Sequence, residues 1–441
     1  MLTQSRLARA AALALSASAA FLFLPQATRA GERPADDPSP LTLENQPQYL
    51  DENLPSLAPS APRSLNTSRA PLMGLLDGAG IAPTLDDARI NIFGHAEVGY
   101  TYNFDRPAKD LNLGRVFDVN NDDVQMNQLD LNIERKLDLK AGQWDVGGRV
   151  EFLYGTDARF IHSSGFFDYG QGSAASSNSK SVAPGPEYQF DIPQIYADLG
   201  IPIGNGLRLR AGKFLFFKQI DPNASVFYSH SFTFGAALPF TLTGTTLYYP
   251  ISDQLSVEGG ISRGWGQTLK DNNGAIDGLG RIRYSSEDHK TDISLALISG
   301  PELDHDNTHY RTVVDATLTT QVTDHLTLLF DGVYGYQALA GGTNSAWYGV
   351  SAYAVCSLND YLTVNGRGEW YRDEEGFTTG IHQTLYEATL GLTLTPFPTN
   401  DLGRNLKIRP EVRYDYSNRH FFDGLSRHDQ TTFAIDAYFD F

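Results

Sequence analysis

Pairs of arginine residues two positions apart are the feature of this sequence that most clearly suggests a function. Arg208 and Arg210 form one such pair, and Arg281 and Arg283 form a second. Residues two apart point to the same face of an extended strand, so each pair sets two guanidinium groups side by side. Rows of like charge select and orient charged solutes where they line a water-filled passage. The alternative is that these charges pair with acids on the same wall and only stiffen the sheet.

Further charged residues fall on the same face as these pairs when the strands predicted below are read with a period of two. This candidate pore-lining set comprises Arg311, Arg367, Arg409, Arg413, Glu97, Asp130, Glu134, Glu151, Asp315, Glu369 and Glu411. Opposed rows of arginine and carboxylate would create a transverse electric field across a lumen. Two more candidates for a constriction, Asp221 and His230, lie in a long connection between strands.

Motifs for catalysis or metal binding are weak. Residues 260–264 match G-x-S-x-G, but a nucleophile elbow needs a strand-to-helix turn, and this match lies within an alternating strand pattern. Residues 304–306 (Asp-His-Asp) are the one constellation that suits hydrolysis. The acid-rich stretches 120–123 and 302–309 offer oxygen ligands for a divalent cation, yet such runs are more often solvated faces. We therefore predict no enzyme, no metal and no cofactor.

The N-terminus indicates export from the cytoplasm. Arg6 and Arg9 precede the apolar stretch 10–24, and small residues follow at 28–30, as in a secretory signal peptide spanning 1–30. Removal of its three arginines changes the formal net charge of −18 to −21. An acidic chain of this kind argues against nucleic acid as a partner. The single cysteine, Cys356, rules out an internal disulfide framework.

Residues 31–88 differ in composition from the rest of the chain. Nine prolines lie between positions 32 and 83, and proline interrupts both sheet ladders and helices because it lacks an N–H group. The sequence predicts a flexible periplasmic segment with a short helical turn at 72–76. Whether this segment blocks the periplasmic mouth of the protein or serves as a tether stays open.

From residue 89 onward, apolar and polar residues alternate strictly. Apolar side chains occupy most even positions of 90–104, and polar ones most odd positions, which predicts a strand with one face of each kind. The predicted strands are 10 to 15 residues long, as suits tilted strands that cross a bilayer. Sixteen are predicted, at 90–104, 124–137, 143–157, 187–200, 206–218, 241–250, 254–265, 275–286, 290–299, 309–322, 325–337, 345–358, 361–372, 383–396, 405–417 and 430–441.

The connections between these strands alternate between long and short. Short turns at one end and long loops at the other are typical of an outer-membrane barrel, which must close because unpaired backbone groups cannot face lipid. We therefore predict an all-β fold, a single transmembrane antiparallel β-barrel of about 16 strands at 89–441. A soluble sandwich or propeller is disfavoured, since sandwich strands are shorter and propeller blades repeat more strongly. The aromatic end at Phe441 is typical of chains read by bacterial barrel-assembly machinery.

Several motifs resemble the bacterial family of OmpL-like β-barrel porins. The resemblance covers about half the chain, and the second half matches only in texture. The matching stretches are 90–94 (INIFG), 100–103 (YTYN), 127–129 (NQL), 147–149 (GGR), 154–157 (YGTD), 193–196 (PQIY), 212–214 (GKF), 227–231 (FYSHS) and 243–244 (TG). The resemblance implies an outer-membrane barrel and a porin, but it names no solute and no catalytic residue.

The prediction for function is an outer-membrane porin for passive diffusion of small hydrophilic solutes or ions. A barrel of 16 strands is wide enough for water, and the connection 219–240, rich in phenylalanine, is a candidate for an inward loop that narrows the lumen. Expected partners are outer-membrane lipid, the barrel-assembly machinery, small hydrophilic solutes and two further copies in a homotrimer. The preference for anions or cations stays open. The alternatives are a plugged structural or adhesive barrel and, as a minor one, a barrel hydrolase.

Overall fold

The computed structural model describes residues 70–167, 186–342 and 344–441. The predicted signal peptide and residues 31–69 of the proline-rich segment lie outside the described residues. Within the described part of the chain, none of the helices is long and apolar enough to cross a membrane.

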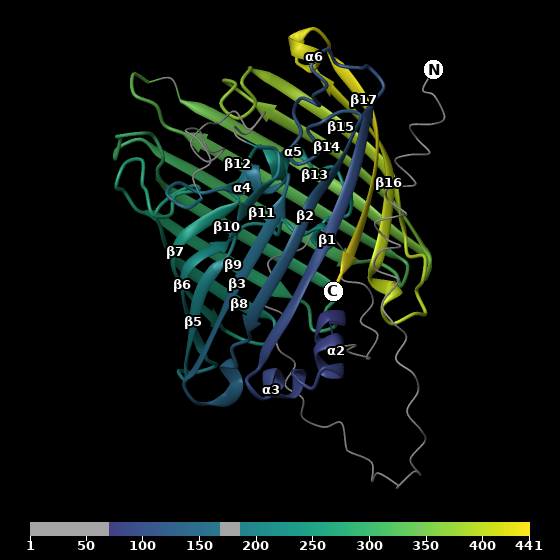
Figure 1. The fold of residues 1–441 in the computed structure, drawn as a ribbon. Coiled ribbons are helices and arrows are strands. Elements are labelled where there is room, and N and C mark those ends of the chain that lie inside the picture. Colours follow the sequence, from purple (N-terminus) through teal and green to yellow (C-terminus); the bar gives the residue numbers. More distant parts are fainter. Residues whose placement is uncertain (1–69, 168–185, 343) are drawn as a thin grey trace. The chain divides into compact units, whose positions relative to one another are not determined.

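Seventeen strands of the described chain join in one antiparallel sheet (Figure 1). In chain order they are β1 (Ile90–Asn103), β2 (Asp123–Arg135), β3 (Asp145–Gly155), β4 (Gln189–Asp191), β5 (Ile195–Ile201), β6 (Leu207–Leu215), β7 (Thr241–Pro250), β8 (Leu255–Ser262), β9 (Asp277–Ser285), β10 (Thr291–Pro301), β11 (Tyr310–Gln321), β12 (Leu326–Gln337), β13 (Ser345–Asn359), β14 (Leu362–Asp373), β15 (Gln383–Leu394), β16 (Leu406–Ser417) and β17 (Asp429–Asp440).

The sheet closes into a barrel because β1 pairs with β2 on one edge and with β17 on the other. At the closing seam, Gly94 and Phe441 exchange two backbone hydrogen bonds of 2.8 Å. β4 and β5 both pair with β3, and the other strands pair with their sequence neighbours, so the ring follows the order of the chain. Closure gives the strand edges hydrogen-bonding partners, as a wall in contact with lipid requires. The predicted transmembrane-type barrel is confirmed.

One predicted strand is wrong in its extent. The stretch 187–200 is split into β4 and β5, which both pair with β3. Pro193 lies in the gap between them, and its missing N–H interrupts the ladder. The two pieces together fill one position in the ring, which gives sixteen positions for seventeen strands. The other fifteen predicted strands are confirmed, with ends within three residues of those observed.

The end of the proline-rich segment, predicted as flexible apart from a helical turn at 72–76, forms two helices. Helix α2 (Pro71–Gly78) and helix α3 (Ala82–Asp87) each have proline in the first turn, where its missing N–H costs nothing. Both pack against β1. Met73 of α2 is 2% exposed, and its Sδ accepts a hydrogen bond of 3.4 Å from the N–H of Ile92.

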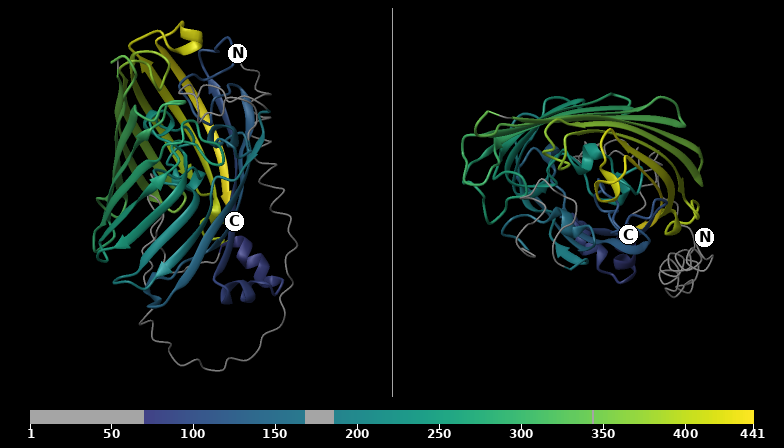
Figure 2. Two further views of the ribbon diagram at one scale, coloured as in Figure 1. Left: turned by 90° about the vertical axis from the view of Figure 1, so that its left-hand side faces the viewer. Right: turned by 90° about the horizontal axis from the view of Figure 1, so that it is seen from above.

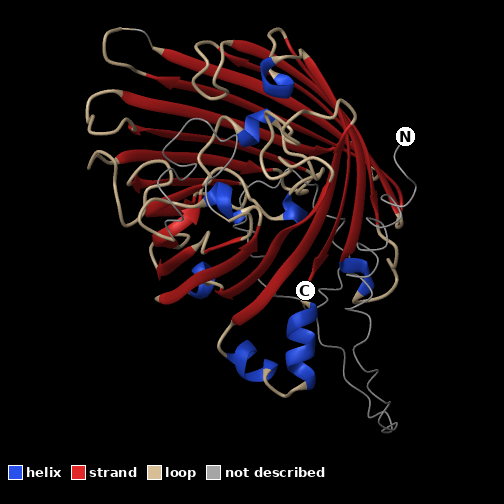
Figure 3. Ribbon diagram, turned by 45° about the horizontal axis from the view of Figure 1, so that its top comes forward, coloured by secondary structure: helices blue, strands red, loops and turns tan. Residues whose placement is uncertain are grey.

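The remaining helices are short and belong to connections (Figure 3). They are the α-helices α4 (Ala158–Ile161), α5 (Phe232–Gly235) and α6 (Phe422–Leu425), and the 3-10 helices η1 (Leu139–Ala141), η2 (Pro222–Ala224) and η3 (Gly403–Asn405). We call the end of the barrel that holds residues 90 and 440 the short-turn end, and the opposite end the long-loop end.

The outer surface of the barrel is an apolar belt. In β2, Leu129 and Leu131 are 43% and 36% exposed, whereas Asp130 between them is 1% exposed. The same alternation runs along most strands, so that apolar side chains face outward and polar ones face the interior. This arrangement inverts that of a soluble protein and suits a surface in contact with hydrocarbon.

Because the belt faces hydrocarbon, a charged side chain at its middle should destabilise the barrel strongly. Val412 lies at the centre of β16 and is 48% exposed, so Val412→Arg should lower the free energy of unfolding by about 2–4 kcal/mol. Leu402→Arg is the matched control, because Leu402 is 39% exposed but lies in the turn before β16; it should change stability by less than about 0.5 kcal/mol. Urea titration in lipid vesicles measures both, and equal losses would contradict the belt.

Candidate functional site

The inner wall carries the charged residues that the sequence singled out. All fifteen strand candidates among the predicted pore-lining residues lie on the face opposite the apolar belt. Eleven of them are buried, namely Arg208, Arg311, Arg367, Arg409, Arg413, Glu97, Asp130, Glu151, Asp315, Glu369 and Glu411. The other four, Arg210, Arg281, Arg283 and Glu134, are partly exposed. Their role in selecting solutes stays a prediction, but their contacts divide them into distinct groups.

The connection between β6 and β7, residues 219–240, lies inside the ring of strands. Figure 2 (right) looks into the ring, and the teal α5 of this connection is seen within it. Three of its aromatic side chains, Phe227, Tyr228 and Phe232, are 1–2% exposed. We call residues 219–240 the inward loop.

Two glutamates of the wall hold the backbone of the inward loop. Glu411 of β16 accepts hydrogen bonds of 3.0 and 3.1 Å from two successive N–H groups of the loop. Glu369 of β14 does the same at 2.7 Å each. The four donors are the N–H groups of Tyr228, Ser229, Phe232 and Thr233. A carboxylate that accepts two N–H bonds fixes a loop more firmly than neutral acceptors do, because each bond is charge-assisted.

Three arginines of the same wall also hold the inward loop. Arg367, Arg409 and Arg413 donate hydrogen bonds of 2.6–2.8 Å to loop carbonyl groups. The acceptors are the carbonyl oxygens of Pro222, Ser225, Ser229 and His230. We call the two glutamates and three arginines the clasp. These arginines were expected to face solute at a constriction; the loop covers them instead, so that their side chains are 0–3% exposed.

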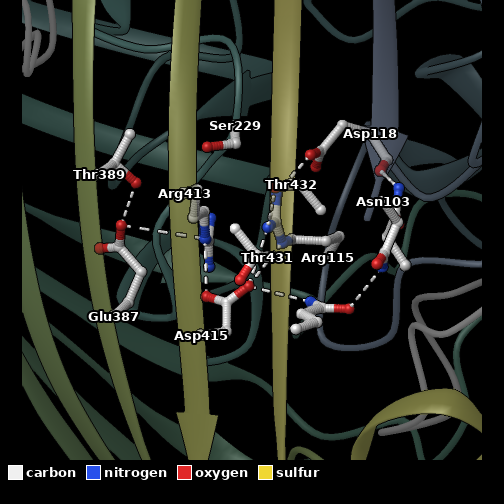
Figure 4. A network of polar contacts seen from close by, with 12 residues as sticks. Asn103, Arg115, Asp118, Ser229, Glu387, Thr389, Arg413, Asp415, Thr431 and Thr432 are labelled. Carbon is white, nitrogen blue, oxygen red and sulfur yellow. Dashed lines mark hydrogen bonds and ion pairs between the residues drawn. The ribbon is translucent and has the colours of Figure 1, made fainter. Parts of the chain in front are cut away.

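The clasp arginines are also neutralised by acids of the wall. Figure 4 shows Arg413 between Asp415, at 2.7 Å, and Glu387. Asp415 also accepts a hydrogen bond of 2.8 Å from Arg115, which belongs to the connection between β1 and β2. In the same way, Arg409 pairs with Asp436 at 2.6 Å. Each positive charge beneath the loop therefore has a carboxylate beside it.

The two candidates within the inward loop have different surroundings. Asp221 stands just before η2 and is partly exposed. The ring of His230 lies against the rings of Phe117 and Phe234, with centroids 5.0 and 4.4 Å away. Burial, and then the positive charge of Arg367 and the other clasp arginines, lowers the pKa of His230 to about 3. The imidazole is therefore neutral at physiological pH.

A second group of charges lies on the wall from β5 to β10. The predicted pairs Arg208/Arg210 and Arg281/Arg283 meet three carboxylates there, at distances of 2.8–3.4 Å. The carboxylates are those of Asp198, Glu258 and Asp292. We call these seven residues the basic strip, since four guanidinium groups against three carboxylates leave one positive charge in excess. Its side chains reach 28% exposure at Arg283 and 14% at Arg210.

An apolar cluster inside the barrel was not anticipated. Wall residues of β9 to β15 and residues of the inward loop pack together in the half of the barrel near the long-loop end, and the wall contributes Leu279, Ile298, Val313, Trp347, Tyr371 and Leu385. The loop side contributes Phe216 and Phe217, which precede the loop, and Phe232 and Leu238 within it. The Nε1–H of Trp347 also donates to the carbonyl of Ala237 at 3.2 Å. A signal exists in the sequence: pairs such as 313–314 and 370–371 are apolar at both positions, which breaks the alternation.

Two further strand candidates, Arg311 and Glu151, contact other side chains of the protein closely. Arg311 is held between the rings of Trp265 and Phe377, 4.7 and 5.0 Å from its guanidinium carbon. Glu151 pairs with Arg149 at 3.1 Å on the wall beside Asp130.

The motifs weighed for catalysis and metal binding do not form a reactive group. Ser262 of the G-x-S-x-G match is 2% exposed at the end of β8, and Asp306 pairs with His309 rather than with His305. Among the described residues, no group of three or more His, Cys, Asp or Glu side chains is arranged to hold a metal ion.

Comparisons with known proteins agree with the fold. A family profile described as "Putative beta-barrel porin-2, OmpL-like" matches residues 89–441. The anion-selective porin from Comamonas acidovorans is similar in structure, with a TM-score of 0.53 and 12% identity over 80% of this chain and 99% of that one. OprB from Pseudomonas putida, in its high-pH structure, gives 0.52 and 12% over 83% and 97%. At such low identity the two structures establish the fold alone. No curated protein sequence matches the chain.

Proposed function

The chain belongs to the family of OmpL-like β-barrel porins, and from this premise we propose that it is a channel for passive diffusion of small hydrophilic solutes and ions. The family and the barrel fold indicate the bacterial outer membrane as its location. Diffusion through such a barrel needs no cofactor and no energy source, and we propose that the protein has no enzymatic activity.

The observation that carries this proposal is a difference in the exposure of charged side chains between two parts of the inner wall. The inward loop covers the wall from β12 to β17, where the clasp arginines are at most 3% exposed. On the wall from β5 to β10, the basic strip keeps partly exposed charges, with Asp292 at 23% and Arg283 at 28%. Charged groups gain free energy from contact with water. We infer that the wet path runs along the basic strip, beside the inward loop.

The basic strip also favours one sign of charge. The strip has an excess of one positive charge along the proposed path, and fixed charges there attract counter-ions and repel co-ions. The clasp adds little to this field because its arginines have carboxylates beside them. We therefore propose a preference for small anions, although the whole chain has a net charge of −18. The charge of the constriction, not the sum, determines selectivity in a pore.

Liposome swelling tests this function. Vesicles that contain the purified protein are diluted into isotonic solutions of sugars of increasing size, and of acetate and ammonium salts. The proposal expects swelling that slows steadily with solute size, and faster entry for the anionic member of a size-matched pair. Vesicles with protein that has been heat-unfolded before reconstitution are the control. Equal permeability in both preparations would refute a diffusion channel.

A second candidate, an occluded structural barrel, is favoured by one observation. The apolar cluster fills space between the inward loop and the wall near the long-loop end, and a tightly packed interior leaves little room for water. The swelling assay separates the two functions, because an occluded barrel admits no solute of any size. A homotrimer and insertion by barrel-assembly machinery stay predictions for either function.

A further inference from the structure

Two histidines meet in the connection between β16 and β17, at the long-loop end. The ring centroids of His420 and His428 are 4.1 Å apart, and the ring planes are inclined by 45°. His420 is exposed and His428 is partly exposed. The pair takes no part in the inward loop, the clasp or the basic strip, so the proposed channel function does not account for it.

The hydrogen bonds of both rings leave the same nitrogen available. The Nδ1 of His420 lies 2.7 Å from the carbonyl oxygen of Ser426, and the Nδ1 of His428 lies 2.9 Å from that of Ser417. A carbonyl oxygen can only accept, so each Nδ1 carries the proton and each Nε2 keeps its lone pair. A ring whose Nδ1–H donates to a carbonyl group is oriented as histidine ligands of metal ions commonly are.

The backbone of the connection holds the two rings together before any ligand arrives. The N–H of Ser417 donates to the carbonyl of His428 at 2.7 Å, which ties the base of the hairpin. Further along, the N–H groups of Phe421 and Phe422 donate to the carbonyl of Arg427 at 2.8 and 3.0 Å. These two phenylalanines are 6% and 1% exposed and belong to the apolar cluster inside the barrel. The connection is thus anchored beside both histidines, and little conformational entropy remains to be lost on binding.

We propose that His420 and His428 form a binding site for one divalent transition metal ion, with the two Nε2 atoms as protein ligands and water in the remaining positions. Imidazole nitrogen suits Cu²⁺, Ni²⁺ and Zn²⁺ better than it suits Mg²⁺ or Ca²⁺. A set of two protein ligands is in keeping with the described residues, where no group of three metal-binding side chains is found. The nearby positive charge of Arg427 is balanced by Asp105, 2.7 Å away.

The proposed site predicts an order of affinity among metal ions and the direction in which affinity changes with pH. Affinity should be highest for Cu²⁺ and lower for Ni²⁺ and Zn²⁺, as the Irving–Williams order requires for a site of this composition. Because only deprotonated imidazole binds a metal ion, affinity should fall as the pH is lowered. Ca²⁺ and Mg²⁺ should not compete.

The experiment is a titration of the full folded chain in detergent with Cu²⁺ alone, read by electron paramagnetic resonance and by calorimetry. Wild type should bind one Cu²⁺ with two nitrogen donors. His420→Ala and His428→Ala should each leave one donor and weaken binding by about 100-fold or more, the lower range of the gain from joining two binding groups. His325→Ala is the matched control. Exposed His325 also has its Nδ1 3.0 Å from a carbonyl oxygen, that of Ser357, but no second imidazole pairs with it among the described residues.

The outcomes decide the proposal in every case. Wild-type affinity and an unchanged spectrum in both alanine variants would overturn it, as would an equal loss in His325→Ala. If His428→Ala does not fold, His420→Ala suffices, because the exposed side chain of His420 adds little to packing. Wild type that binds no Cu²⁺ would show that the two rings only stack on each other. None of these results depends on whether the barrel conducts.

Discussion

The double variant Glu369→Gln/Glu411→Gln is expected to conduct roughly twofold or more current than the unmodified protein, since current follows the narrowest part of a wet pore. The two carboxylates accept four N–H bonds of the inward loop, at 2.7–3.1 Å. Bonds to a charged acceptor contribute about 1.5–3 kcal/mol each. An amide keeps one acceptor oxygen and turns an NH₂ group toward the loop donors, so the loop loses its hold while the side-chain volume is kept.

Single-channel recording in planar bilayers measures this effect. Besides the higher mean current, the variant should show larger fluctuations within the open state, because the loop then samples several positions. Glu287→Gln is the matched control, since Glu287 is an exposed glutamate in the turn between β9 and β10, away from the clasp; it should leave the current unchanged. Circular dichroism shows whether each barrel has folded. Folded double variant with wild-type current would mean that the clasp does not position the constriction.

A change in the charge of the basic strip is expected to reverse the ion selectivity of the channel. Replacing Arg281 and Arg283 with glutamine leaves two guanidinium groups against three carboxylates in the basic strip, so its net charge changes from +1 to −1. The reversal potential in a KCl gradient should then change sign, from anion preference to cation preference, because the proposed path follows the basic strip and ions respond to the fixed charge along it. Neither arginine contacts the loop carbonyl groups that the clasp holds, so the loop should stay in place.

A control variant separates local charge from total charge. Arg404→Gln/Arg419→Gln removes the same two positive charges, but Arg404 lies in the turn before β16 and Arg419 in an outer connection. This variant should keep the wild-type reversal potential. If both double variants shift it equally, the total charge of the protein sets the preference and the basic strip has no special role.

The barrel could be predicted from sequence because its alternation is a local signal. Residues such as Leu129, Asp130 and Leu131 show it directly, and lipid on one side and polar surroundings on the other enforce it along most strands. The split at Pro193 was also visible in principle, since proline within a central strand argues against an unbroken one. The helical turn predicted at 72–76 lies within the helix 71–78, whereas the helix at 82–87 was not predicted because its proline lies in the first turn, where a helix tolerates it.

The interior could be predicted only in part. Alternation correctly puts Arg367, Arg409 and Arg413 on the inner face, but it gives no information about what covers a side chain. Their partners in the inward loop lie 138–187 positions away in sequence, and such contacts follow from the closed ring and not from local pattern. The inward loop itself was suggested by its phenylalanines, because a loop packed inside a barrel must bury apolar surface. The histidine pair was missed because His420 and His428 become neighbours only through the hairpin.

We infer that the closed barrel encloses a wet path that the inward loop narrows but does not seal. Single-channel recording of the unmodified protein in symmetric KCl tests it most directly, after flotation with vesicles has shown that the barrel is inserted. We predict discrete, stable current steps whose size is proportional to voltage. An inserted and folded barrel that carries no current would contradict the account and leave an occluded barrel in its place.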